Sequence, residues 1–130
     1  LAPFSPESAA LQAGRLMLQE LARHFAAGAS FAFETTLAGR GYLNHIREWQ
    51  AAGYRVKLIF LQLDHAEEAI ARVAQRVRQG GHNIPENTIR RRFIAGRNNF
   101  AQIYASQVDA WALYNSSGPQ PVLLDWSDKS

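Results

Sequence analysis

The spacing of hydrophobic and polar residues divides this chain into predicted helices and strands. The first stretch carries its apolar residues at helical spacing, at Leu11, Leu18, Leu21 and Phe25. Before them, Ser5–Glu7 supplies a capping hydroxyl, a first-turn proline and an acid near the positive helix end. Gly28 ends the pattern, so we expect a helix from residue 5 to about Ala27.

Two strands and a short helix are predicted next. Ser30–Leu37 (SFAFETTL) is rich in aromatic and β-branched side chains, as strands are. Tyr42–Ala52 is typical of a short helix, and Gly53 closes it. Tyr54–Leu63 (YRVKLIFLQL) is a nearly continuous apolar run, which predicts a strand buried on both faces.

Helical patterns dominate the second half of the chain. Asp64 can cap a helix that has Glu67 at its third position and ends at Gly80–Gly81. Pro85 opens a longer helix, which we expect to continue, with a break, to Tyr114. One face of this helix carries Ile89, Phe93, Gly96, Phe100, Ile103 and Tyr104. The final predicted strand is Pro121–Trp126 (PVLLDW).

The order of these elements indicates the fold class. Strands that alternate with helices predict an α/β fold with a doubly wound, mostly parallel sheet. Three strands are few for such a sheet, which usually has about five or six. Ligands of doubly wound folds bind beyond the carboxyl ends of the strands, so the candidate site residues lie at 34–40, at 63–65 and from Trp126 onward.

Composition narrows the class of protein. With 130 residues, 47% hydrophobic and 11% aromatic, the chain can build one core, so we expect a single domain. Its lack of cysteine excludes disulfides, thiolate zinc sites and cysteine nucleophiles. No apolar stretch nears the roughly 20 residues that cross a bilayer, and the first ten residues lack signal-peptide features. We therefore expect a cytoplasmic protein without membrane partners.

Positive charge is concentrated in one part of the chain. The net charge is +3, and 12 of the 14 basic residues are arginine. The stretch Arg72–Arg97 holds seven of these arginines and a single acid, Glu86. Because the arginine fork suits phosphate oxygens, a phosphate-bearing ligand is indicated. A solvated surface with paired arginines is the alternative, and nucleic-acid binding is disfavoured because the aromatic residues fall on the core face.

Two arrangements of residues point to chemistry. Glu34 lies at the end of an apolar strand, where a buried carboxylate needs a cation, a substrate donor or a catalytic proton. Alternatively, Glu34 is exposed or paired with an arginine. Arg72 and Arg76 share one side of their helix just before Gly80–Gly81, a plausible hinge. With the arginines of the following helix, they predict a lid that closes over phosphates.

Other catalytic motifs are missing from the sequence. The four histidines are scattered and no HExxH occurs, so we expect no metal site built from protein ligands alone. The chain also has no GxSxG and no Walker A motif. Lys57, the lysine that precedes the carboxyl-terminal one, lies inside a predicted strand.

Four segments of the chain, taken in order, resemble one known family. They are PFSPESAALQAGRLM, SFAFETTLAGR, GYRVKLIFLQL and RVRQGGHNIPENTIRRRF. Together they are similar to the bacterial zeta-toxin-like P-loop kinases, and the likeness runs from about Pro3 to Asp125. The resemblance implies ATP-dependent phosphoryl transfer with Mg²⁺. It further implies a small-molecule acceptor, a hydroxyl of a nucleotide sugar such as UDP-N-acetylglucosamine.

The same resemblance implies which residues hold the acceptor. Glu34 and Thr36 match the family's Glu-x-Thr that binds the sugar substrate. Arg40 lies near the family's substrate-side arginine, although its spacing differs. These three residues form the expected substrate-binding set.

Roles at the transferring phosphate follow from the resemblance as well. Arg76 matches an arginine that contacts this phosphate. A second arginine is expected where this chain has His82, which would contribute a weaker, pH-dependent charge. Otherwise Arg90 would act as the second catalytic cation, or Arg78 would bind the nucleotide.

The chain departs from the family pattern at its start. Family members begin with a strand, a GxxGxGK[ST] loop, a helix and a second strand that ends in aspartate, and this chain opens after that point. We therefore expect residues 1–130 to form the carboxyl-terminal part of a kinase domain. In the family's strand order the missing strand separates the two strong strands of this chain, so their inner edges would lack a partner. The expected partner is the missing segment or an antitoxin-like protein.

Two further functions stay open at this stage. The chain could be a degenerate interaction module that binds a partner without catalysis, and alone it would be inactive. An RNA-binding domain is the third interpretation, and it predicts an affinity that falls steeply with salt.

Overall fold

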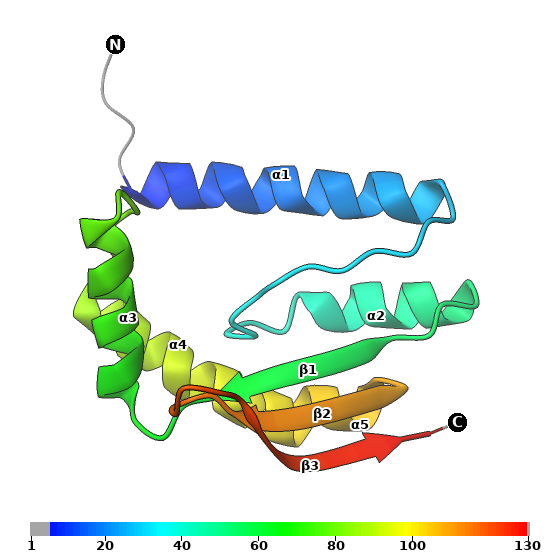
Figure 1. Ribbon diagram of the computed structural model, residues 1–130. Helices are drawn as coiled ribbons and strands as arrows, with labels where there is room; N and C mark the ends of the chain where they lie inside the picture. Colours follow the sequence, from blue (N-terminus) through cyan, green and yellow to red (C-terminus); the bar gives the residue numbers. More distant parts are fainter. Residues whose placement is uncertain (1–5, 130) are drawn as a thin grey trace.

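The computed structural model describes residues 6–129, and it contains helices packed beside a small sheet (Figure 1). The elements are α1 (Pro6–Ala26), α2 (Tyr42–Ala51), β1 (Lys57–Gln62), α3 (Ala66–Arg78), α4 (Glu86–Asn99), the π-helix η1 (Phe100–Tyr104), α5 (Ala105–Gln107), β2 (Ala110–Asn115) and β3 (Val122–Asp128). Between α1 and α2 the chain runs extended beside the sheet but joins no strand pair. The predicted α/β class is confirmed.

The sheet has the order β1-β2-β3 and is of mixed direction. β1 and β2 are parallel, and β2 and β3 are antiparallel. In the register, Ile59 stands opposite Ala112, and Ala112 stands opposite Trp126. The parallel pair includes β2, a strand that the sequence analysis did not predict. The doubly wound, mostly parallel arrangement is not confirmed by this three-stranded sheet.

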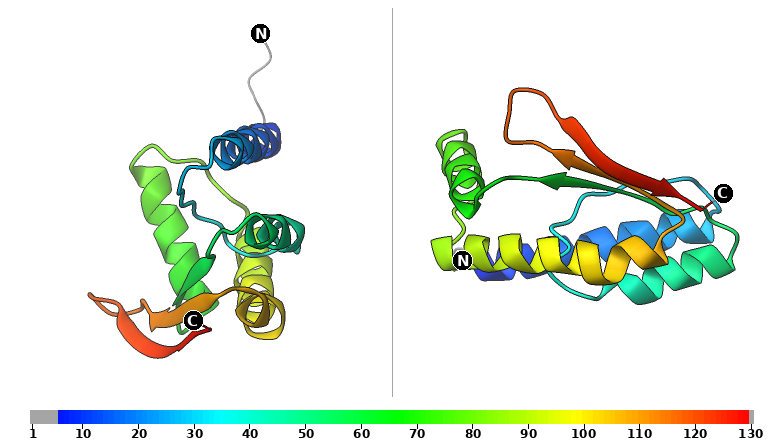
Figure 2. Two further views of the ribbon diagram at one scale, coloured as in Figure 1. Left: turned by 90° about the vertical axis from the view of Figure 1, so that its right-hand side faces the viewer. Right: turned by 90° about the horizontal axis from the view of Figure 1, so that it is seen from below.

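The two faces of the sheet are covered unequally. α4, η1 and α5 run along one face, while α3 stands near the carboxyl end of β1 on the other side (Figures 1 and 2). In the described part of the chain, no helix covers the rest of that second face. Ile59, Leu61 and Trp126 are accordingly 55%, 56% and 64% exposed. The prediction that the β1 region is buried on both faces is therefore wrong, since its burial alternates from residue to residue.

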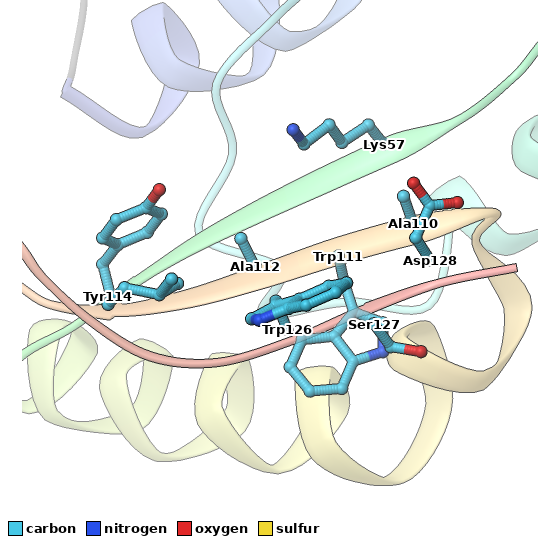
Figure 3. A pocket seen from close by; sticks show the side chains of 9 residues that line it. Lys57, Ala110, Trp111, Ala112, Tyr114, Trp126, Ser127 and Asp128 are labelled. Atoms are coloured by element: carbon cyan, nitrogen blue, oxygen red, sulfur yellow. The ribbon is translucent and has the colours of Figure 1, made fainter. Parts of the chain in front are cut away.

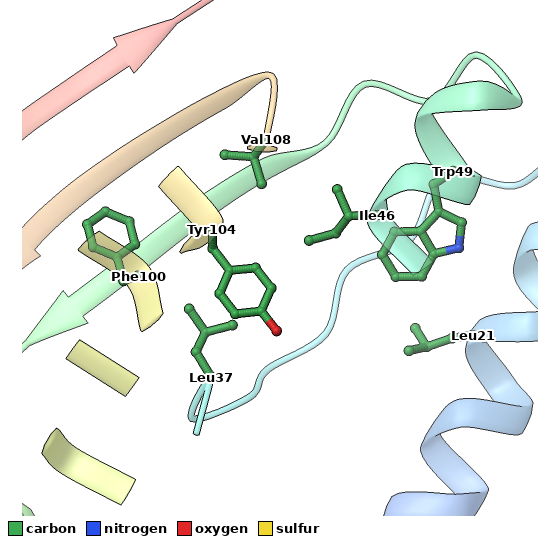
Figure 4. Close-up of a cluster of buried hydrophobic side chains, with 7 residues drawn as sticks. All are labelled: Leu21, Leu37, Ile46, Trp49, Phe100, Tyr104 and Val108. Carbon is green, nitrogen blue, oxygen red and sulfur yellow. The ribbon is translucent and has the colours of Figure 1, made fainter. Parts of the chain in front are cut away.

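The core lies where α1, α2, η1 and the extended segment meet (Figure 4). Its buried side chains are Leu21, Leu37, Ile46, Trp49, Phe100, Tyr104 and Val108. Aromatic contacts join the elements around it. The Phe31 ring meets Trp49 edge to face at 5.2 Å between centroids, and Phe60 of β1 stacks on Phe100 at 4.8 Å. The core thus ties the extended segment to α2 and the sheet to η1.

Several predicted boundaries are confirmed. α1 ends at Ala26, followed by Gly28 with a φ of 70°, a left-handed conformation that glycine adopts without strain. α2 ends at Ala51 and α4 begins directly after Pro85. The predicted capping residue Ser5 lies outside the described residues. The final strand is found as well, although it spans Val122–Asp128.

The strand predicted at Ser30–Leu37 is wrong, because residues 29–38 form no sheet ladder. Their alternating pattern serves a different purpose. Phe31 and Phe33 pack against the Trp49 ring of α2, with centroids 5.2 and 5.9 Å apart. Alternation therefore orients side chains here without a neighbouring strand among the described residues.

The helix predicted to reach Tyr114 is also wrong, since helical structure ends at Gln107 and β2 follows. The reason lies in AWALYN, where Ala110 and Ala112 are buried and Trp111 between them is only partly buried, the alternation of a strand. The Asp64 cap is wrong too. His65 occupies the cap position, while the Asp64 carboxylate accepts a 2.7 Å hydrogen bond from Asn115 Nδ2.

Asp109 fixes the start of β2 to its neighbours. Its Oδ2 accepts hydrogen bonds from the Val56 amide at 2.7 Å and from Gln50 Nε2 at 3.2 Å. The Val56 N–H bond is the main reason that the pKa of Asp109 lies below its usual value. Because the folded pKa is lowered, the carboxylate stabilises the fold above the unfolded pKa of about 4, and this contribution is lost as pH falls through the folded value.

We expect Asp109→Ala to lower the free energy of unfolding by about 2 kcal/mol at pH 7, the size of hydrogen bonds to a charged group. Urea unfolding at pH 7 and at several values below pH 4 measures this. The difference from wild type should shrink in acid. Asp125→Ala is the matched control, because that exposed carboxylate accepts a bond from the adjacent Trp126 amide. A difference that stays constant with pH would contradict the assignment.

Candidate functional site

A cleft of about 850 Å³ opens beside β1. Its lining comes from residues 31–37 and from β1, α3 and α4. The basic side chains that line it are Arg55, Lys57, Arg72, Arg76, Arg92 and Arg97. Glu34 is the one acidic residue among the lining residues. The cleft is therefore strongly positive and suits an anionic ligand.

The structure brings together three of the seven predicted site residues. Glu34, Thr36 and Arg76 all line the cleft, although they come from segments about forty residues apart. Glu34 and Thr36 are exposed on one wall, and Arg76 extends from the last turn of α3. Within residues 6–129, no arginine or lysine forms an ion pair with Glu34. The Glu34 carboxylate is thus available to a ligand.

The other predicted residues, Arg40, Arg78, His82 and Arg90, do not line the cleft. Arg90 has partners of its own, since it contacts Glu67 at 3.0 Å and Glu86 at 3.3 Å. The hydrogen bond that Arg90 donates to the Glu67 carboxylate is the main cause of a raised Arg90 pKa. The pair with Glu67 joins α3 to α4, and the pair with Glu86 lies within α4. The catalytic roles of Arg90 and His82 stay predictions, as do the binding roles of Arg78 and Arg40.

Two basic residues of the cleft had no role in the sequence analysis. Lys57 was noted there as a strand residue, and Arg55 just before β1 was not singled out. Arg97 lies with its guanidinium carbon 6.0 Å from the centre of the Phe93 ring. The helical spacing of Ile89, Phe93 and Gly96 could have indicated that Arg92 and Arg97 line a common site, because both arginines flank that face.

The connection from α3 to α4 carries two adjacent glycines. Gly80 has a φ of 95°, and the Gly81 amide donates a 2.7 Å hydrogen bond to the Arg76 carbonyl. A Cβ at Gly81 would come within 2.8 Å of that carbonyl oxygen. The bend is therefore tied to the backbone of Arg76, and the hinge at these glycines stays a prediction.

A polar network joins α3 to the loop after β2. Arg72 Nη2 donates a 2.5 Å hydrogen bond to the Ser116 carbonyl, and the Asp64 amide donates to Ser117 Oγ at 2.9 Å. The Ser116 amide in turn donates to the Gln62 carbonyl at 2.7 Å. The carboxyl ends of the two parallel strands and the first half of α3 thus form one unit at the end of the cleft.

Comparison with known proteins decides the family. The zeta toxin sequence profile matches residues 6–120, most of the chain. This chain belongs to the zeta toxin family. An uncharacterized protein of Haemophilus influenzae is 30% identical to this zeta toxin family member over 93 residues, 70% of this chain and 65% of the relative. The chain thus spans about two thirds of that relative. No solved structure matches this chain significantly.

The cleft of this zeta toxin family member fits the phosphates of a nucleotide. Its six basic side chains supply hydrogen-bond forks and charge that phosphate oxygens accept. For Mg²⁺ the lining offers one carboxylate, Glu34, and the hydroxyls of Thr35 and Thr36. Such an ion commonly uses one or two carboxylates together with the substrate phosphates. Nowhere in residues 6–129 do three His, Asp or Glu side chains gather as a metal cluster.

A second, smaller hollow of about 220 Å³ lies on the open face of the sheet (Figure 3). Lys57, Ala112, Tyr114, Trp126 and Asp128 contribute to its lining. The hollow includes residues 126–128, which belong to a predicted strand-end region, but none of the seven residues that were given a predicted role.

Among the described helices, none is long and apolar enough to cross a membrane.

Proposed function

We propose that this protein is part of an ATP-dependent small-molecule kinase, which transfers the γ-phosphate of ATP to a hydroxyl of a nucleotide sugar such as UDP-N-acetylglucosamine. The observation that carries the proposal is the cleft, which Glu34 and Thr36 line together with a set of arginines. A kinase needs both an acceptor-binding wall and cations for the transferring phosphate. Membership of the zeta toxin family supports the same reaction class. Because the reaction uses ATP, we expect this activity in the cytoplasm.

Each wall of the cleft has a proposed task. On one side, the carboxylate of Glu34 accepts a hydrogen bond from an acceptor hydroxyl, and Thr36 donates or accepts beside it. On the other side, Arg76 contacts the transferred phosphoryl group and offsets charge that develops on its oxygens. Arg72 and Arg92 line the same cleft and add to the positive field. ATP and its Mg²⁺ supply the phosphoryl group.

We expect Glu34→Gln to impair use of the acceptor while ATP binding is retained. The amide keeps the size of the side chain but loses the charged acceptor, so the acceptor KM should rise about tenfold or more, the cost of a hydrogen bond to a charged group. Steady-state phosphorylation of UDP-N-acetylglucosamine by the complete protein gives this constant, and calorimetric titration gives ATP affinity.

Glu48→Gln is the matched control, because Glu48 is an exposed residue of α2 that does not line the cleft. It should leave both constants unchanged. If Glu34→Gln weakened ATP binding alone, the proposed acceptor role would be wrong. If the wild-type protein transferred no phosphate to any nucleotide sugar, the acceptor class would be wrong.

A second candidate function is a protein-interaction module without catalysis, and one observation favours it. The open face of the sheet exposes Ile59, Leu61 and Trp126, which is unusual for apolar side chains that lie close together. Within the described residues β1 is also paired on one edge only. An antitoxin-like protein that packed there would explain the exposure. Phosphoryl transfer by the complete protein separates the two functions.

A further inference from the structure

The turn that follows Thr36 has an unusual backbone conformation. Leu37 has a φ of 55°, a left-handed conformation that a residue other than glycine adopts at a cost. Its side chain is 4% exposed and belongs to the core. The turn therefore keeps this backbone only if its surroundings hold it. Glu34, Thr36 and Arg40, the predicted acceptor residues, lie on this turn or directly beside it.

Three residues on one side of the α4–η1 helix contact this turn. Asn99 Nδ2 donates a 2.7 Å hydrogen bond to the Leu37 carbonyl. Tyr104 donates from its hydroxyl to the Gly39 carbonyl at 2.7 Å. Gly96 is buried against the Thr36 carbonyl, and a Cβ there would stand 2.2 Å from that oxygen.

The π-helix explains how these residues reach the same turn. In an α-helix, residues five positions apart lie about 140° apart around the axis, since one turn takes 3.6 residues. In η1 the Ala105 amide bonds to the Phe100 carbonyl, the i to i+5 pattern that places residues five apart nearly above one another. Asn99 and Tyr104 are five apart. The π turn thus brings both donors to the side that faces residues 37–39.

We propose that Asn99 and Tyr104 are positioning residues, which hold the turn after Thr36 at a fixed place relative to the arginines of α4. This inference rests on the proposed kinase function for its catalytic consequence. α4 carries Arg92 and Arg97 into the cleft, and the same helix grips the opposite wall through the two donors. These two hydrogen bonds fix the distance between the walls of the cleft. Small displacements of the reacting groups there would lower the rate strongly.

The first arm of the test measures turnover of the complete protein with ATP and UDP-N-acetylglucosamine. Asn99→Ala should lower kcat about tenfold to a hundredfold, because a misplacement of about 1 Å has effects of that size. The KM for ATP should stay unchanged. Asn99→Gln keeps the donor amide and should recover part of the rate. Asn98→Ala removes the same side chain from the adjacent exposed position and should match wild type.

The second arm does not depend on activity. Hydrogen–deuterium exchange of residues 34–40 should be faster in Asn99→Ala and in Tyr104→Phe than in Asn98→Ala, because the turn loses a donor. Tyr104→Phe keeps the buried ring, so it replaces Asn99→Ala as the test if the latter does not fold. It too should lower kcat while the KM for ATP stays unchanged.

The outcomes separate the inference from the proposed function. If wild type is active and the Asn99 and Asn98 variants have equal kcat, the positioning role is overturned. If wild type shows no transfer, the proposed function fails, and exchange alone decides whether the two donors hold the turn. Equal exchange in all variants would overturn the inference, and faster exchange confined to the turn would support it.

Discussion

Replacing Arg76 by alanine should reduce phosphoryl transfer by the complete protein about a hundredfold to a thousandfold, the effect of removing one donor that stabilises transition-state charge. Arg76 lines the same cleft as Glu34, and the Gly81 amide donates a hydrogen bond to its carbonyl at the bend. The side chain is exposed, so the free energy of unfolding should change by less than about 0.5 kcal/mol. Release of ADP in the presence of UDP-N-acetylglucosamine measures the rate.

Arg91→Ala is the control for this experiment. Arg91 is an exposed arginine of α4 that does not line the cleft, so its loss removes the same charge without touching the site. Its turnover should match wild type. Wild-type turnover in Arg76→Ala would contradict the role given to Arg76, and equal losses in both variants would indicate an effect of net charge.

Gly96→Ala should destabilise the fold by about 3 kcal/mol, at the upper end of overpacking effects. The new Cβ would lie 2.2 Å from the Thr36 carbonyl oxygen, a backbone atom of a turn that the core and Asn99 already hold. Alanine is about 1 kcal/mol better than glycine within a helix, so any loss has to come from this contact.

Thermal unfolding followed by circular dichroism measures the change, and a decrease in Tm of about 10 °C is expected for a chain of this size. Gly118→Ala is the control, because the nearest atom to a Cβ there is 3.9 Å away. It should change the Tm by about 2 °C at most. An unchanged or higher Tm for Gly96→Ala would show that the turn can move away from α4.

Local patterns in the sequence predicted the helices well. The apolar face of Ile89, Gly96 and Tyr104 and the stop at Gly28 follow from neighbours within a few residues. Strand pairing was harder, because it depends on distant partners. Phe31 and Phe33 alternate as strand residues do, yet they pack on Trp49. β2 was missed because the helix before it ends without a glycine or proline.

The candidate site was predicted in part. The arginine-rich stretch indicated an anion site that includes Arg76, and the family resemblance implied acceptor binding by Glu34 and Thr36; all three line one cleft. The ion pair between Arg90 and Glu67 could not be predicted, since Glu67 lies on another helix. The contacts of Asn99 and Tyr104 were also hidden, because their convergence depends on a π turn that no motif announces.

The open face of the sheet also governs how the protein behaves in concentrated solution. The exposed apolar surface of Ile59, Leu61 and Trp126 favours association between molecules. The net charge of +3 gives only modest repulsion against it. Salt weakens that repulsion and leaves the apolar attraction intact. The tendency of this chain to aggregate therefore depends more on whether these three apolar side chains are covered than on the arginines that dominate its charge.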